Sequence, residues 1–325
     1  MRLMGRHRIL GGILLLWLIC AFLPVFQASG SSDPLGFPLR IGLLDFGVPL
    51  EFFLGASGGQ LEIFDLTTRK AVYSGTAEWV RVRVANGGFQ MELDSKKAMF
   101  CSHRVALTPI GRPPHFMKVG TNARNLRAYR GSVELLPYGS RILMVNLIPM
   151  EEYLRSVVPS EIGSAGPPAA LEAQAIAART YAVRNLKRHA GSGFYLCDGQ
   201  HCQAYKGMLQ EAMRSGKAVE DSHGLVLTYQ GEVANTVYHA HCGGSLAACN
   251  KVWGGVVVPY LQAHPDRVGN GMPFCSWFDV VKNRKVGSQG KKKTSVPENF
   301  EKSLKWLWTG PDPTSWNTDS RGHRV

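Results

Sequence analysis

An alanine-rich segment places the tightest constraint on how this chain folds. Seven of the 14 residues from Ala169 to Ala182 are alanine, and Pro167-Pro168 precedes them as a helix start. Basic residues and glycines in the following KRHAGSG are typical of a helix end. Small side chains let a neighbouring backbone approach closely, so the sequence predicts a central helix. Helical spacing puts five apolar residues on one stripe: Leu171, Ala175, Ala178, Ala182 and Leu186.

The chain before residue 146 has the pattern of strands instead. Apolar and β-branched residues alternate or run together in PLRIGLLDF, QLEIFDL, VRVRVANGGFQMEL and SRILMVNLI, with glycine-rich breaks between them. DLTTRKAVYSG is typical of a hairpin. In NLIPMEEYLRSVV, Pro149 and two acids mark a helix start, and Pro159 is expected to end that helix. Residues 225 to 242 then predict two more strands, with Gln230-Gly231 near the turn.

These patterns predict an α+β protein. A β-rich N-terminal part is joined to a core in which helices pack on a mostly antiparallel sheet, built partly from residues 225 to 242. We expect a signal peptide at 1–30, a β-rich region at 31–145, a core at 146–265 and a C-terminal tail at 266–325. The tail combines a basic loop, KNRKVGSQGKKK, with an amphipathic helix in ENFEKSLKWLWTG. The 325 residues are 45% hydrophobic, which is enough to bury a substantial core.

The N-terminus has the layout of a secretory signal. Its first ten residues hold three arginines and no acid, and 18 apolar residues follow from Ile9 to Phe26. The small residues of QASGSSD then predict cleavage near Ala28 or Gly30. An uncleaved anchor is the alternative, because 18 residues just suffice to cross a bilayer. We therefore expect export across the inner membrane to the periplasm or cell wall, with cleavage favoured by Pro24 over anchoring.

The chain is strongly basic. Lys and Arg number 37 against 24 acids, a net charge of +13, which suits a polyanionic partner such as nucleic acid, an anionic membrane surface or an anionic cell-wall polymer. The sequence shows no RNA-binding signature, zinc-finger spacing or basic region with a zipper. Nucleic acid is therefore the least supported of the three.

Cysteine and histidine gather in two clusters. The first holds Cys197, His201 and Cys202, and the second holds His239, His241 and Cys242 within YHAHCGG. The two clusters can converge on a tetrahedral zinc. Disulfides are the alternative, because export opens an oxidising compartment and six cysteines remain after the signal, an even number. Zinc binding and disulfide formation therefore both stay open for the six cysteines: Cys101, Cys197, Cys202, Cys242, Cys249 and Cys275.

Glu161 is a single acid that we place on a short loop between the two helices. Packing over a weakly charged, alanine-faced helix favours desolvation, which raises the pKa of a carboxyl group. A carboxyl that keeps its proton is the tool that protonates the leaving oxygen of a glycosidic bond. Gln174, Arg179 and Tyr181 on the next helix are candidates to bind sugar, although Arg179 has the alternative of pairing with Glu152 or a helix end.

Several blocks between Tyr129 and Asp266 resemble one family in content and order. They are YRGSVEL, VNLIPMEEYLRSVVPSEIG, AALEAQAIAARTYAVR, CDGQHCQAYKG, YHAHCGG and PYLQAHPD. Together they resemble the SpoIID/LytB family, bacterial proteins of sporulation and cell-wall remodelling. Sporulation members are lytic transglycosylases, which cut peptidoglycan glycan strands and leave a 1,6-anhydro end. The resemblance implies this activity here.

The resemblance also implies residue roles. Glu161 occupies the family's Val-Val-x-x-Glu position, that of the catalytic acid/base, and Gln203 and Tyr205 match a CQ-x-Y block that shapes the groove. Some members hold zinc near the active site through a loop like CDGQHC. Two departures stand out, Ile162 for the usual methionine and YHAHCGG for FHS-x-x-GG. The implied metal ligands are Cys197, His201 and Cys202, with His239 as a further candidate.

Three functions stay open from the sequence. The first is an exported lytic transglycosylase whose partner is the peptidoglycan glycan strand. The second is a non-catalytic wall-binding enhancer of another hydrolase, such as an amidase. The third is a zinc hydrolase centred on the Cys/His cluster, against which the absence of an HExxH helix counts.

Overall fold

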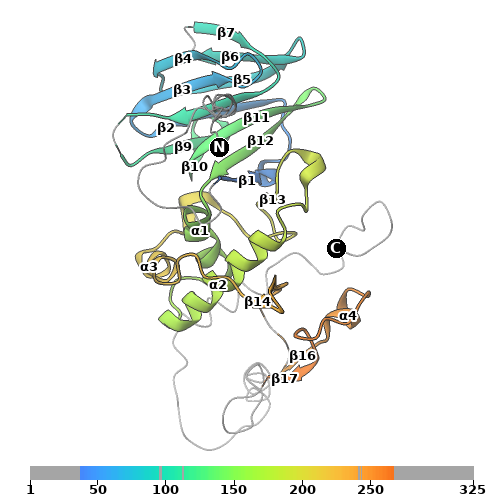
Figure 1. Ribbon diagram of the computed structural model, residues 1–325. Coiled ribbons are helices and arrows are strands. Elements are labelled where there is room, and N and C mark those ends of the chain that lie inside the picture. The colour runs from blue at the N-terminus through green and yellow to red at the C-terminus, as the bar shows by residue number, and fades with distance from the viewer. Residues whose placement is uncertain (1–36, 95–96, 112, 241, 243, 267–325) are drawn as a thin grey trace, which may run out of the picture.

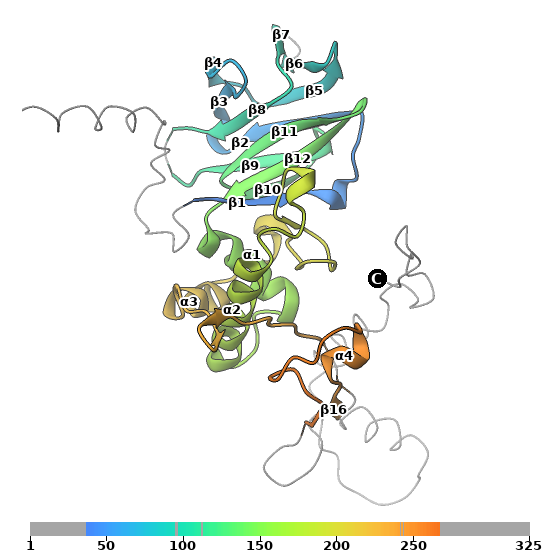
Figure 2. The same ribbon diagram turned by 45° about the vertical axis from the view of Figure 1, so that its right-hand side comes forward.

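The computed structural model describes residues 37–266 except 95–96, 112, 241 and 243 (Figure 1). Two β-sheets enclose a hydrophobic core, and helices α1, α2 and α3 gather at one end of the β-structure (Figures 1 and 2). The predicted signal peptide, basic loop and C-terminal helix lie outside the described residues. Within them, no helix combines the length and apolar character needed to cross a membrane.

The two sheets contain most of the strands. Their internal pairings are antiparallel, except that β13 runs parallel to β1. The seven-stranded sheet has the order β13 (Leu196–Cys197), β1 (Leu39–Gly42), β12 (Arg141–Ile148), β11 (Ser132–Tyr138), β8 (Val105–Pro109), β3 (Gln60–Asp65) and β4 (Lys70–Thr76). The six-stranded sheet has the order β10 (Asn125–Arg130), β9 (Phe116–Asn122), β2 (Glu51–Ala56), β5 (Val80–Ala85), β6 (Gly88–Leu93) and β7 (Lys97–Cys101).

Alternation in the sequence explains why these segments form strands. In β5, Val80 and Val82 are buried while Arg81 between them is not, and they pair with the buried Leu93 and Met91 of β6. The turn between the two strands is Asn86-Gly87, both with positive φ, as a tight hairpin requires. The hairpin predicted in DLTTRKAVYSG is confirmed as β3 and β4.

The helices are α1 (Met150–Ile162), α2 (Pro168–Arg184), α3 (Met213–Asp221) and α4 (Cys249–Val252). Helix α2 begins at Pro168, as predicted, and packs against both α1 and α3. Four members of its predicted stripe are fully buried and Leu186 is partly buried, which confirms a central helix: Leu171, Ala175, Ala178 and Ala182.

Pro159 does not end α1, contrary to the sequence prediction. The helix continues to Ile162 and stops at Gly163, whose φ of 73° lies in the left-handed region. Proline removes one hydrogen bond from the ladder, and here that loss is tolerated because Val157, Val158 and Pro159 are all buried. Glu161 consequently lies in the last turn of a helix and not on a loop.

The α+β class with a β-rich N-terminal part is confirmed, but the predicted platform under the helices is wrong. The described residues of 225–242 form only a two-residue ladder, β14 (Thr228–Tyr229) with β15 (Glu232–Val233), around the predicted turn. Its side chains are mostly exposed and cannot support a helix layer. A second short ladder joins β16 (Ser245–Leu246) to β17 (His264–Pro265). The predicted domain boundary at residue 146 falls inside strand β12. Strand β13, which follows this boundary in the chain, pairs with β1 in the seven-stranded sheet.

A buried ion pair joins the helices. Arg179 has no exposed surface, and its guanidinium donates to both carboxylate oxygens of Glu151, at 2.8 and 2.7 Å. It also donates to the carbonyl of Leu225 at 3.0 Å and to that of Val219 at 3.4 Å. The predicted pairing with Glu152 is therefore replaced by one with Glu151, and Arg179 does not reach the surface to meet a sugar.

We expect Arg179→Met to lower the free energy of unfolding by about 3–5 kcal/mol, because it strands the Glu151 carboxylate in a buried position. Urea unfolding measures the change. The matched control is Arg184→Met, on the exposed face of the same helix, which is expected to stay within about 0.5 kcal/mol of the parent. Equal stability of the two variants would contradict a structural role for Arg179.

Candidate active site and Cys/His cluster

Glu161 is a half-buried carboxyl at the C-terminal end of α1. Its Oε1 accepts hydrogen bonds from the amide of Ala204 at 2.6 Å and from the hydroxyl of Tyr238 at 3.3 Å. Among the described residues, the contacts leave Oε2 without a hydrogen-bond partner. Burial raises the pKa of Glu161 above its ordinary value, although the two donors and the charge of Lys206 act in the opposite direction. Such a carboxyl can hold a proton and give it to a ligand at Oε2.

Tyr238 belongs to a short hydrogen-bond chain that ends on Glu161. Tyr153 donates to Oε1 of Gln203 at 3.2 Å, and Nε2 of Gln203 donates to the Tyr238 hydroxyl at 2.9 Å. Because the Tyr238 oxygen accepts from Gln203, its single proton is directed at Glu161. Gln203 is 1% exposed, so the chain is fixed inside the protein.

Sequence reasoning missed Tyr238. It is the first residue of YHAHCGG, where the family block carries phenylalanine, so the pattern gave no reason to assign it a polar role. Its 77-residue separation from Glu161 also hides the contact. The available signal was the departure itself, a hydroxyl where a plain aromatic ring is usual.

The other predicted sugar-binding residues lie mostly inside. Tyr205 is 1% exposed, and its hydroxyl donates to Asn146 at 2.6 Å while its ring packs between Tyr129 and Tyr153. Tyr205 therefore supports the site from within the core. Tyr181 and Gln174 are buried on α2. Burial raises the pKa of Tyr181; the charge of Arg188 acts in the opposite direction, and those of the nearby cysteines and of Glu161 add to the rise.

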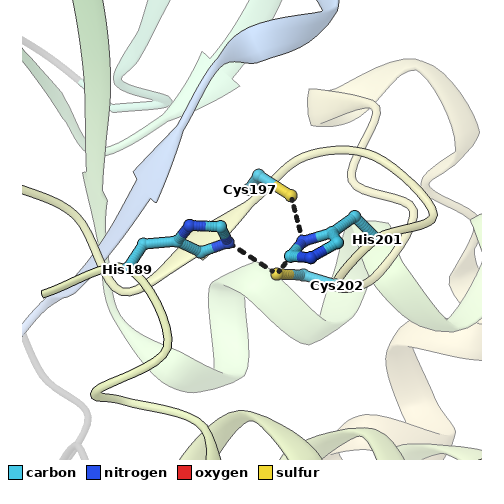
Figure 3. A group of neighbouring side chains, drawn as sticks. All are labelled: His189, Cys197, His201 and Cys202. Carbon is cyan, nitrogen blue, oxygen red and sulfur yellow. Dashed lines mark hydrogen bonds between the residues drawn. The ribbon is translucent and has the colours of Figure 1, made fainter. Parts of the chain in front are cut away.

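Four side chains form a compact Cys/His cluster: His189, Cys197, His201 and Cys202, whose ligand atoms all lie within 4.8 Å of one another (Figure 3). Nε2 of His189 is 3.3 Å from Sγ of Cys202, and Nδ1 of His201 is 3.6 Å from both sulfurs. Three members are those predicted. The fourth is His189, from the segment interpreted only as a helix end, and not His239, whose side chain is exposed and outside the cluster.

The donors fit a tetrahedral zinc ion. Zinc bonds of about 2.3 Å to sulfur and about 2.0 Å to nitrogen separate the two ligand types by about 3.6 Å, close to the separations in the cluster. Hydrogen bonds from Cys202 and His201 lower the pKa of Cys197 to about 4, against the effect of burial. Burial lowers the pKa of His189. The hydrogen bond to Cys197 raises the pKa of Cys202, so the cluster presents one thiolate and a neutral imidazole in the states that a metal requires, and metal binding would displace the proton of Cys202.

Four cysteines in the described part of the chain form no disulfide: Cys101, Cys197, Cys202 and Cys249. Cys275, and His241 of the second cluster, lie outside the described residues.

The loop that carries the Cys/His cluster also carries residues that contact the Glu161 site. Cys202 is followed directly by Gln203, which orients Tyr238, and by Ala204, whose amide holds Glu161. At the other end of the loop, the buried carboxylate of Asp198 accepts hydrogen bonds from the amides of Leu44 and Asp45. The conformation of the Cys/His loop therefore positions the Ala204 amide directly, and the Tyr238 hydroxyl through Gln203, for their hydrogen bonds to Glu161.

These features define an α+β protein with one acid/base candidate on a helix beside a Cys/His cluster. Residues 138–229 match the family described as Stage II sporulation protein, SpoIID. This segment, which contains Glu161 and the whole cluster, is therefore similar to that family. Tyr238 lies beyond the matched segment.

Three curated proteins are similar to parts of this chain. An uncharacterized protein of Brachyspira hyodysenteriae is 34% identical over 134 residues, 41% of this chain and 36% of its own. The amidase enhancer of Bacillus subtilis is 37% identical over 113 residues, 35% of this chain and 15% of its own. Stage II sporulation protein D of Bacillus subtilis is 31% identical over 134 residues, 37% of this chain and 39% of its own. The chain thus spans less than half the length of these relatives.

Proposed function

We propose that the protein is exported and remodels the bacterial cell wall as a lytic transglycosylase that cleaves peptidoglycan glycan strands, with Glu161 as the acid/base. The observation that carries the proposal is the Glu161 carboxyl itself, half-buried, raised in pKa and held at one oxygen by Ala204 and Tyr238. The sporulation and amidase-enhancer names of the relatives are consistent with a cell-wall role. Incubation with purified glycan strands tests the proposal, and mass spectrometry is expected to find 1,6-anhydro products.

One carboxyl is sufficient for this reaction. Protonated Glu161 gives its proton to the glycosidic oxygen as the bond to the sugar breaks. The carboxylate that results is stabilised by the amide of Ala204 and the hydroxyl of Tyr238. It then takes the proton of the sugar's own 6-hydroxyl, which closes the anhydro ring. No water is consumed, and Glu161 returns to its starting state.

We further propose that the Cys/His cluster holds zinc. The four protein ligands make a closed set, which is typical of structural zinc sites and leaves no position open for substrate. Bound zinc would supply cross-linking of the loop rather than chemistry on the sugar. The residues of the loop would then keep the Ala204 amide and Tyr238 directed at Glu161.

A non-catalytic role is the second candidate, because the relative with the highest identity given above is named an amidase enhancer. That role predicts no cleavage products unless an amidase is added. The purified protein acting alone on glycan strands therefore separates the two functions. A zinc hydrolase is less well supported, since its metal needs an open position.

We expect Tyr238→Phe to move the alkaline limb of the pH–activity profile upward by as much as about one pH unit. The variant removes a hydrogen bond that favours the carboxylate, so the pKa of Glu161 rises further. The matched control is Tyr229→Phe, a partly exposed tyrosine in β14. A profile that does not move would show that the Tyr238 hydroxyl has no influence on Glu161.

A further inference from the structure

A second polar site lies on the seven-stranded sheet, on the face opposite to the buried Val133 and Leu135. Two arginines there share one buried carboxylate. Arg40 of β1 donates from Nη1 to Oε2 of Glu134 at 2.6 Å, and Arg104 donates from Nε and Nη2 to Oε1 at 2.9 and 2.6 Å. The side chain of Glu134 is 1% exposed. None of these three residues takes part in the proposed reaction.

Strand register explains the grouping. Glu134 is aligned with Ala106 of β8 and with Val145 of β12, and Val145 is aligned with Gly42 of β1. Arg104 and Arg40 each stand two residues before their aligned positions. Because side chains two apart share a face, both arginines project on the same side as Glu134. The sheet itself therefore builds the arrangement.

The charges do not cancel. Two guanidinium groups face one carboxylate, which leaves an excess of one positive charge. Among the described residues, Nη2 of Arg40 and Nη1 of Arg104 have no hydrogen-bond partner, and 48% of the Arg104 side chain is exposed. These two unused N–H groups can bind a further oxyanion in addition to the Glu134 carboxylate.

Segment 190–195 and the two arginines line an open cavity of about 390 Å³. Nε of Arg40 donates to the carbonyl of Gly193 at 2.8 Å, which ties this segment to the sheet. Leu136 and Phe194 provide an apolar wall. The ring of Phe194 also stacks on His189 with centroids 4.8 Å apart, so one ring separates the cavity from the Cys/His cluster. The cavity thus combines a cationic floor with a wall that suits a small apolar group.

We propose that this cavity binds an oxyanion of the cell-wall polymer that carries a small apolar group, such as the terminal carboxylate of an alanine-ended wall peptide. The inference rests on the proposed cell-wall function and adds a part of the polymer that Glu161 does not contact. A phosphate group of an anionic wall polymer offers the same chemistry. The two sources differ in charge and in the apolar group, so separate probes distinguish them.

Isothermal titration calorimetry on the full chain carrying Glu161→Gln tests the proposal without turnover. The probes are acetyl-D-alanyl-D-alanine, its C-terminal amide and glycerol phosphate. We expect the acid to bind at least about tenfold more tightly than the amide, and Arg104→Gln to weaken binding by about tenfold, the effect of losing one charge-assisted contact. Arg83→Gln, an exposed arginine of β5 in the other sheet, removes the same charge and is expected to have no effect.

Each outcome of the titration supports or overturns the proposed oxyanion site. Selective binding of glycerol phosphate that Arg104→Gln weakens supports the oxyanion site and assigns it to the phosphate source. Equal binding of acid and amide, or binding that Arg104→Gln leaves unchanged in a protein with parental thermal unfolding, overturns the site. If the parent cleaves glycan strands but no probe binds the cavity, the oxyanion site is refuted and the proposed transglycosylase is not. If a probe binds the cavity but the parent does not cleave, only the transglycosylase proposal is refuted.

Discussion

Replacing Glu161 with glutamine is expected to lower the rate of glycan-strand cleavage by about 10²–10⁴-fold, the usual contribution of a general acid/base. Glutamine keeps the size of the side chain, and its Oε1 still accepts from the Ala204 amide and the Tyr238 hydroxyl. The variant therefore loses the transferable proton while the site around it stays in place. Mass spectrometry of glycan digests, with and without the substitution, measures the loss of 1,6-anhydro products.

The fold of this variant is expected to remain intact. The pKa of Glu161 is raised in the native protein, so between its unfolded and native pKa values the native state binds more protons than the unfolded state. Its contribution to stability is present below the unfolded pKa and is lost as pH rises through the native one. Glutamine does not titrate, so the variant should be at least as stable as the parent at neutral pH.

Glu172→Gln on α2 is the matched control, because it removes one acid from the neighbouring helix without touching Glu161. It is expected to cleave as the parent does. Cleavage should also fall as pH rises past the raised pKa of Glu161, since only the protonated form donates. Full activity of Glu161→Gln would rule out the proposed acid/base and return the amidase-enhancer role to first place.

Replacing His189 with alanine is expected to abolish stoichiometric zinc binding and to lower the free energy of unfolding by more than about 4 kcal/mol, the range in which loss of a metal site falls. Nε2 of His189 lies 3.3 Å from Sγ of Cys202, within the group of four donors (Figure 3). Without it the set has three members and is no longer closed. Elemental analysis of the purified protein and thermal unfolding with and without a chelator measure the two effects.

His239→Ala is the informative control for this prediction. The sequence offered His239 as a further candidate ligand, whereas the structure leaves its side chain exposed and outside the cluster. We expect His239→Ala to keep its zinc and its stability. Zinc loss from His239→Ala with retention by His189→Ala would reverse the ligand assignment.

Zinc removal is also expected to slow cleavage, because the loop of the cluster carries the Gln203 and Ala204 contacts on which Glu161 depends. The effect should be indirect. Glu161→Gln is accordingly expected to retain its zinc while losing activity. A variant that lost both together would point to a metal with a direct part in the reaction.

Much of the local structure was predictable from the sequence. The stripe Leu171, Ala175, Ala178 and Ala182 identified α2 because a helix repeats its buried face every three or four residues. The β3–β4 hairpin was predicted in DLTTRKAVYSG, and the strand character of β5 and β6 followed from alternation in VRVRVANGGFQMEL. Pro159 was misjudged, because burial of its neighbours outweighed a local rule.

The sequence alone determined which residue types were present and what they could do: one carboxyl in the family's position and three close cysteines and histidines in CDGQHC. Only the tertiary structure decided what surrounds them. The contact of Tyr238 with Glu161 spans 77 residues, that of Ala204 with Glu161 spans 43, and His189 reaches Cys202 across 13. Periodicity and spacing report neighbours along a helix or strand, whereas burial, pKa and a ligand set depend on groups that only the folded chain brings together.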